Sequence, residues 1–246
     1  MFNLKSIYLN FIKQEGYLYD LLFYLSFALT ILISVVMEKN TLIYFTPVVI
    51  FTLLLKYINI TKGKPNYLYI IGLIAIIISD ILTFKDFDKL FSWITILTSI
   101  YLICSSLILK QYLNKSKLEN ILFLSVLIGL LLASYIIYSV LDLLIKHLSN
   151  TNLVYTIMIT FILITYVISC AIIYINDYYD NATLILTSGI FCMFHIALTP
   201  INEFIYFTQT FTVLITITHV ISIYLCMKFI AETEIIKKEN LKKKYF

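Results

Sequence analysis

The sequence predicts an all-α protein, a polytopic bundle of about eight transmembrane helices that forms one integral membrane domain over residues 1–246. Two observations carry this prediction. The chain is 61% hydrophobic and 13% charged, whereas soluble proteins are ordinarily about 45–50% apolar and about 25% charged. Apolar runs of membrane-spanning length also recur along the chain, with most charges in the short turns between them. The five glycines and three prolines leave little room for long loops.

Eight apolar runs define the expected spans. They cover about residues 18–37, 42–58, 67–84, 90–109, 118–141, 153–175, 182–198 and 208–230. A short polar segment, residues 1–16, precedes them and is interpreted as an interfacial helix. A basic tail, residues 231–246, follows them. Lys56 lies near the end of the second run, where its long side chain is expected to reach the lipid headgroups as an anchor.

The distribution of lysines predicts the orientation in the membrane. The chain contains no arginine. Of its 18 lysines, all except Lys39, Lys85, Lys89 and Lys146 fall at the termini or on the side of the membrane that carries the termini. Because basic residues are retained in the cytoplasm, both termini are expected there. We expect the protein in the plasma membrane, the inner membrane of a bacterium.

Several classes of function lack support in the sequence. Outside the tail there is no basic patch for nucleic acid, so no nucleic-acid partner is expected. Four cysteines lie in apolar runs without CxxC spacing, which indicates neither a disulfide framework nor a zinc site. These are Cys104, Cys170, Cys192 and Cys226. No P-loop, HExxH or GxSxG motif occurs, and no cofactor is expected. The two halves share no pair of Gly/Pro-broken spans, which argues against a transporter with inverted repeats.

Asp80, next to Ser79, is the carboxylate that lies well inside an apolar run. Such a group costs at least about 2.5–3.5 kcal/mol to insert, and it usually faces a cavity. The structural alternative is an Asp that reaches the headgroups or bonds a neighbouring hydroxyl. The predicted topology places His195 at a similar depth, and His219 lies on another helix. We interpret Asp80, His195 and His219 as one site. Metal binding by these three is conceivable, but no HxxxH or HxxE pair supports it.

Small polar residues recur at helical spacing in four of the runs. They are Thr95, Thr98, Tyr101 and Ser105; Ser134, Tyr138 and Asp142; Ser188, Cys192, His195 and Thr199; and Thr208, Thr212, His219, Ser222 and Cys226. Because lipid disfavours these faces, all four are expected to point into the bundle. There they would either bond neighbouring helices or line a wet cavity.

With these positions laid out, the chain resembles the YhhN-like lysoplasmalogenase family of eight-span membrane proteins. The resemblance covers about residues 45–109 and 189–227. Thr46-Pro47 occupies the position of a Lys-Pro motif of the family, and Ser79-Asp80 occupies that of a Gly-Asp motif. His195 occupies the position of a second Asp. His219 and Tyr101 occupy positions where the family has polar residues, in the last span and in the fourth. The motif Lys, Gly and second Asp are therefore replaced here.

The resemblance implies hydrolysis of the vinyl ether bond of a lysoplasmalogen, with a membrane lysolipid as the substrate. It assigns Asp80 and His195 to catalysis. It assigns His219, Tyr101, Ser79 and Thr46 to substrate binding. In this chemistry a general acid protonates the alkene, and water attacks the resulting cation. A buried carboxyl favours its neutral form and can donate this proton. A neutral imidazole at position 195 can accept a proton from water but supplies no negative charge.

Two other functions stay open on the sequence. One is a non-catalytic lipid-binding or assembly protein of the same fold. The other is a small transporter or sensor in which Asp80 binds a proton or a ligand. The sequence also leaves open whether the chain forms a homo-oligomer.

The lysine asymmetry generates a testable topology. Reporter fusions at residue 240 and in the 85–89 turn are expected to report opposite sides of the membrane, with residue 240 in the cytoplasm. The measurement is a pair of reporters that are active on only one side, such as alkaline phosphatase and green fluorescent protein. Both fusions reporting the same side would contradict the eight-span topology.

Overall fold

The computed structural model describes residues 4–113, 120–175 and 179–233. Within these ranges the chain forms eight long helices and a short 3₁₀ turn, with no strand. The elements are α1 (Leu4–Val36), η1 (Lys39–Thr41), α2 (Leu42–Ile60), α3 (Tyr67–Lys85), α4 (Phe87–Leu113), α5 (Asn120–Ile145), α6 (Asn150–Ile175), α7 (Ala182–Phe204) and α8 (Gln209–Glu232). Each long helix is apolar enough to cross a membrane. The all-α class of an integral, multi-pass membrane protein is therefore confirmed.

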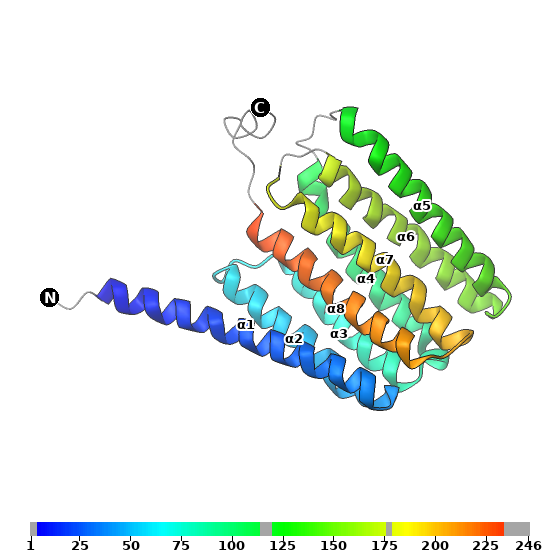
Figure 1. The fold of residues 1–246 in the computed structure, drawn as a ribbon, viewed down its shortest axis with the longest axis horizontal. Coiled ribbons are helices and arrows are strands. Elements are labelled where there is room, and N and C mark those ends of the chain that lie inside the picture. Colours follow the sequence, from blue (N-terminus) through cyan, green and yellow to red (C-terminus); the bar gives the residue numbers. More distant parts are fainter. Residues whose placement is uncertain (1–3, 114–119, 176–178, 234–246) are drawn as a thin grey trace.

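The helices extend past several of the predicted runs. The first span continues backward through residues 4–16, so that α1 is a single helix of 33 residues rather than a span with a separate interfacial helix. No proline interrupts this stretch, which allows the hydrogen-bond ladder to continue. At 1.5 Å per residue α1 is about 50 Å long, and its first turns project beyond the bundle (Figure 1). The expected start of the fifth run at 118–119 and the tail from residue 234 lie outside the described residues.

Seven of the helices pack in a closed ring. The order of neighbours is α1, α2, α3, α4, α6, α7, α8 and back to α1. Short connections join α2 to α3, α3 to α4 and α7 to α8, as the scarcity of glycine and proline predicts. The described chain begins and ends at the same end of the bundle (Figure 1). Helices α3 and α8 consequently face each other across the ring, which matters for the polar residues inside it.

Glycine allows close helix contacts at two points of the ring. A Cβ atom at Gly72 on α3 would lie 3.2 Å from Cδ2 of Tyr101 and 3.6 Å from Cβ of Cys104 on α4. A Cβ atom at Gly189 on α7 would lie 3.2 Å from Cβ of Cys170 on α6. Since lipid chains are as apolar as the helices, close packing of small residues is a main source of helix association in a membrane. These two contacts therefore hold two adjacent pairs of the ring together.

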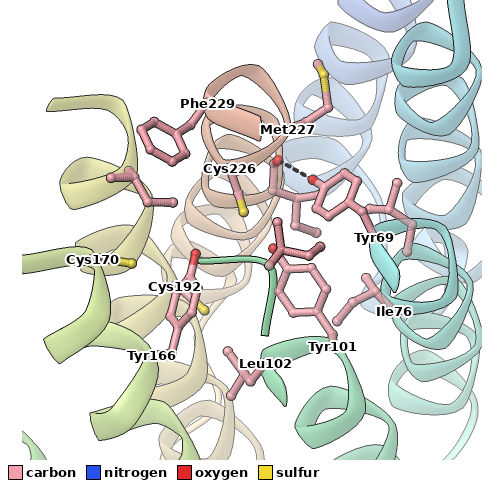
Figure 2. Packing of buried hydrophobic residues seen from close by; sticks show 14 of the residues in the cluster. Tyr69, Ile76, Tyr101, Leu102, Tyr166, Cys170, Cys192, Cys226, Met227 and Phe229 are labelled. Atoms are coloured by element: carbon pink, nitrogen blue, oxygen red, sulfur yellow. Dashed lines mark hydrogen bonds between the residues drawn. The ribbon is translucent and has the colours of Figure 1, made fainter. Parts of the chain in front are cut away.

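Large aromatic side chains fill the bundle near the termini end. Tyr69, Tyr101 and Tyr166 are almost completely buried, together with Leu102 and Met227. Figure 2 shows them packed against three cysteines of α6, α7 and α8. The hydroxyl of Tyr69 donates a hydrogen bond of 3.0 Å to the carbonyl of Ile223. The cysteines are free and buried, so they pack here as small apolar side chains.

Helix α5 lies at the edge of the bundle, against α6 and α7, outside the ring (Figure 1). The prediction that its polar face points into the bundle is wrong, because Ser134, Tyr138 and Asp142 are exposed. Apolar residues such as Leu144, which is 1% exposed, face the bundle instead. Because α5 contacts its neighbours along one side only, most of its surface, this polar face included, is left for the surroundings.

Lys56 does not extend outward to the headgroups as expected. It is only 5% exposed, and its Nζ atom lies 2.9 Å from Oδ1 of Asp20 on α1. The same ammonium group lies over the rings of Phe23, Tyr24 and Tyr224, 4.7–5.2 Å from their centroids. Cation–π attraction and the carboxylate together replace the water that this charge loses. Lys56 thereby ties α2 to α1 and α8.

Replacing Gly72 with Leu is expected to lower the stability of the bundle by about 1–3 kcal/mol, because the new side chain overpacks the α3–α4 contact. The matched control is Gly129→Leu on α5, where a Cβ atom would meet nothing within 4 Å. Thermal unfolding of the purified protein in detergent measures both variants. Equal stability of Gly72→Leu and Gly129→Leu would contradict the role of Gly72 in packing.

Candidate functional site

A cavity of about 110 Å³ opens inside the bundle at the end that carries η1 and the α7–α8 connection. It is lined by α2 to α8, and most of its wall is apolar, including Phe91, Leu141 and Ile159. Six of the polar side chains in the wall are threonines of α4, α6 and α8. A concave, mostly apolar pocket with few convergent polar groups is typical of ligand sites. It is also large enough to hold several water molecules.

Asp80 and His219 meet in this cavity. Nε2 of His219 lies 3.0 Å from Oδ1 and 3.2 Å from Oδ2 of Asp80. Asp80 on α3 is 7% exposed and His219 on α8 is 4% exposed. The two residues are 139 positions apart in the chain and stand on helices that face each other across the ring. The buried carboxyl group thus finds its partner on a distant helix, as intramembrane acids usually do.

His195 on α7 joins this pair through its ring. The centroids of the His195 and His219 rings are 4.1 Å apart, with the ring planes inclined by 33°. Nδ1 of His195 is buried and has no hydrogen-bond partner among the described residues. His195 also lines the cavity. The site therefore contains a carboxyl group, an imidazole that contacts it, and a second imidazole whose Nδ1 atom is available to a ligand or water.

Helical spacing explains why these side chains converge. On α8, Thr212, Thr216 and His219 lie four and three residues apart and share one face. On α7, His195 and Thr199 do the same, and Thr199 donates a hydrogen bond of 2.7 Å to the carbonyl of His195. On both helices these polar side chains therefore lie toward the interior of the bundle. The cavity forms where these faces meet.

Ser79 and Thr46 also line the cavity, but they do not bond Asp80. The Ser79 hydroxyl lies 3.1 Å from Oγ1 of Thr98 and 3.4 Å from the carbonyl of Ile94, to which it donates, so it links α3 to α4. Thr46 on α2 is 2% exposed, and its hydroxyl has no partner among the described residues. Both side chains can still contact a bound ligand, since both face the cavity.

Tyr101 lies elsewhere, in the aromatic core of Figure 2, and is not part of the cavity wall. Its ring packs against Gly72, which precedes Asp80 by eight residues, or about 12 Å along α3. Thr95 and Thr98 of the same helical face do line the cavity. The inward face of α4 was predicted correctly, but Tyr101 lies about one helical turn beyond Thr98, outside the cavity wall and in the aromatic core.

The structure adds residues that the sequence analysis did not single out. Lys39 and Glu203 lie at the mouth of the cavity and form an ion pair. Asn202 and Thr216 lie in the wall, and both are almost fully buried. Thr216 could have been found from its spacing between Thr212 and His219. The ion pair could not, because it joins two turns that are 164 positions apart. No group of three His, Cys, Asp or Glu side chains in the described part of the chain is arranged to hold a metal ion.

A double-mutant cycle on stability is expected to show strong coupling between Asp80 and His219. Asp80→Leu or His219→Leu alone leaves a buried polar partner unsatisfied, at a cost of about 1–3 kcal/mol. The double variant is expected to lose less than the sum, with a coupling energy of about 0.5–3 kcal/mol. Thermal or denaturant unfolding in detergent measures the cycle. The uncoupled control is a second cycle that combines His219→Leu with Asp86→Leu, a change at a partly exposed carboxylate. Additive losses for Asp80 and His219 would contradict their contact.

No protein-family model matches the chain, and comparison with curated proteins and with solved structures found no similar chain.

Proposed function

We propose that this protein is a membrane-embedded hydrolase of a single-chain lipid, of the lysoplasmalogenase type, with Asp80 as its general acid. The observation that carries the proposal is the buried Asp80–His219 pair, which faces an apolar cavity in a bundle of membrane helices. A hydrolase for a water-soluble substrate has no need of such a wall. A lipid chain matches it, because contact with apolar side chains replaces contact with other lipids.

The first step of the proposed reaction is protonation of the alkene. The Asp80 carboxyl group gives its proton to the carbon that is β to the ether oxygen, and the π electrons of the alkene form the new C–H bond. The positive charge that develops is shared by the α carbon and the ether oxygen. The carboxylate that remains on Asp80 stabilises this cation at short range. His219, 3.0 Å away, holds the carboxyl group in place.

The second step is attack of water on the α carbon. The water oxygen forms the new C–O bond, and one of its protons passes to a basic group of the site. Nδ1 of His195 is suited to this, since it is buried and without a partner among the described residues. The resulting hemiacetal breaks its bond to the ether oxygen. That oxygen leaves as an alcohol with the proton that His195 took from water. The hydroxyl group of the hemiacetal gives its proton to the Asp80 carboxylate, and its O–H electrons form the carbonyl bond of the aldehyde. One water is consumed, and Asp80 and His195 return to their starting states.

The vinyl ether specificity comes from the sequence resemblance, while the structural support is for acid chemistry on an apolar substrate. In this proposal the chain works without the second acid of that family. Asp80 supplies both the proton and, after the transfer, the negative charge. His195 stands where the second acid is expected and takes over its role toward water. The proposal thus requires one carboxyl group and two imidazoles, all of which meet in the cavity.

Asp80→Asn is expected to lower lysoplasmalogen cleavage by about 10²–10⁴-fold, because it removes the proton while keeping the shape of the side chain. The measurement is aldehyde release by the purified protein from vinyl ether lysolipids, with saturated ether lysolipids as inert substrates. The matched control is Asp86→Asn, an exposed carboxylate at the same end of the bundle, which is expected to leave the rate unchanged.

Unchanged turnover in Asp80→Asn would contradict the proposal. If the unaltered protein binds lysolipids without cleaving them, the lipid-binding function replaces it. Proton-coupled uptake of a solute into vesicles, lost in Asp80→Asn, would instead establish the transporter function.

A further inference from the structure

The mouth of the cavity carries an ion pair of two residues that the proposed chemistry does not use. Nζ of Lys39 in η1 donates a hydrogen bond to Oε2 of Glu203 in the last turn of α7. Their side chains are 17% and 13% exposed, and both line the cavity. The pair therefore connects the α1–α2 turn to the α7–α8 turn across the opening.

The fold does not need this pair to hold the mouth in shape. Gln209 donates hydrogen bonds to the carbonyls of Ser34 and Met37, which fixes the start of α8 against the end of α1. Asn202 accepts a hydrogen bond of 2.9 Å from the backbone of Thr208 and donates one of 3.2 Å to Thr212. These neutral bonds close the turns on both sides of the opening. A ligand could separate Lys39 from Glu203 without releasing the turns.

The position of Glu203 is also unfavourable for stability alone. A negative charge in the last turn of a helix opposes the helix dipole, and a largely desolvated ion pair gains little net free energy. The structure thus keeps two opposite charges at the opening of an apolar cavity, where neither the helix nor the fold benefits much. This arrangement suits the recognition of a ligand that carries both signs of charge.

The distance from the mouth to the reacting groups fits such a ligand. Glu203 follows His195 by eight residues on α7, which is about 12 Å along the helix. In a lysolipid with a phosphoethanolamine or phosphocholine headgroup, about nine bonds separate the ether oxygen from the amine nitrogen. An extended chain covers roughly 3.8 Å for every three bonds, so the two atoms are about 11 Å apart. The phosphate lies about midway.

From this geometry we propose that Lys39 and Glu203 form a headgroup subsite for zwitterionic phospho-amine lipids. Lys39 binds the phosphate and Glu203 binds the ammonium group. When no lipid is bound, the two side chains pair with each other across the mouth of the cavity. The inference rests on the proposed function, which places the reacting bond at Asp80 and His195. It adds the specificity for the headgroup and names the residues that set it.

The test is equilibrium binding of saturated ether lysolipids, which cannot be cleaved, to the purified full-length protein in nanodiscs. One ligand carries a phosphoethanolamine headgroup and the other carries phosphate alone. The unaltered protein is expected to prefer the first. Glu203→Gln is expected to weaken binding of the phosphoethanolamine ligand at least tenfold without weakening that of the phosphate ligand. Lys39→Met is expected to weaken binding of both ligands.

A charge-swapped variant separates recognition from a structural role. Lys39→Glu combined with Glu203→Lys can re-form the ion pair and the closed mouth, but it presents the wrong charge to each part of the headgroup. It is expected to keep the thermal stability of the unaltered protein but to lose its affinity for the phosphoethanolamine ligand. The control is the exposed pair Asp86–Lys89 at the same end of the bundle, where Asp86→Asn and Lys89→Met are expected to change neither affinity.

Two results would overturn the inference: restored affinity in the charge-swapped variant, or equal losses for both ligands in Glu203→Gln. Either would mean that the pair is structural. Because the ligands are not cleaved, the outcome does not depend on turnover. If the protein shows the expected charge selectivity but releases no aldehyde, the headgroup subsite is supported and the proposed hydrolase function is contradicted.

Discussion

The contact between Asp80 and His219 is the interaction on which the interior of this bundle depends. A carboxyl group among apolar helices must find a polar partner inside the protein, because lipid offers none. Helices α3 and α8 face each other across the ring, so this partner is reached only through the middle of the bundle. The contact fixes the depth of one helix relative to the other. It also keeps polar atoms, and room for water, at the centre of an apolar structure.

The two ends of the bundle are built differently from the same helical faces. Toward the termini, tyrosines such as Tyr101 and Tyr166 fill the interior and leave no open space. Toward η1, the interior faces of α4 and α8 carry the smaller side chains Thr98 and Thr212, which line the cavity. The cavity is the volume that these smaller side chains leave. Its position follows from residue size as much as from polarity.

Charge is arranged at two depths along this cavity, with apolar walls between them. Asp80 and His219 lie inside, and Lys39 and Glu203 lie at the opening. An amphiphile with a polar head and a scissile bond near the start of its chain has the same order of groups. The distance between the inner pair and the outer pair therefore connects the proposed chemistry with the proposed headgroup recognition. It also explains why the mouth pair need not contribute to stability.

The sequence by itself determined the membrane class, the number of helices and their approximate bounds. These follow from apolar length and composition, which lipid imposes on each segment separately. It also singled out Asp80, His195 and His219, because ionisable residues are rare in such segments. Their roles came only with the tertiary structure. The resemblance assigned His219 to substrate binding, and the structure adds that its ring contacts Asp80. This contact could not be predicted, because the depth and rotation of α8 depend on packing with other helices.

The tertiary structure also decided which polar faces have a partner. The faces of α4, α7 and α8 turn inward as their spacing predicted, but that of α5 turns outward because α5 has neighbours on one side only. Lys56 is buried under aromatic rings that come from α1 and α8. Lys39 meets Glu203 because two distant turns close the same opening. Spacing within a helix predicts which residues share a face; which neighbour that face meets is set by long-range packing, and no local pattern encodes it.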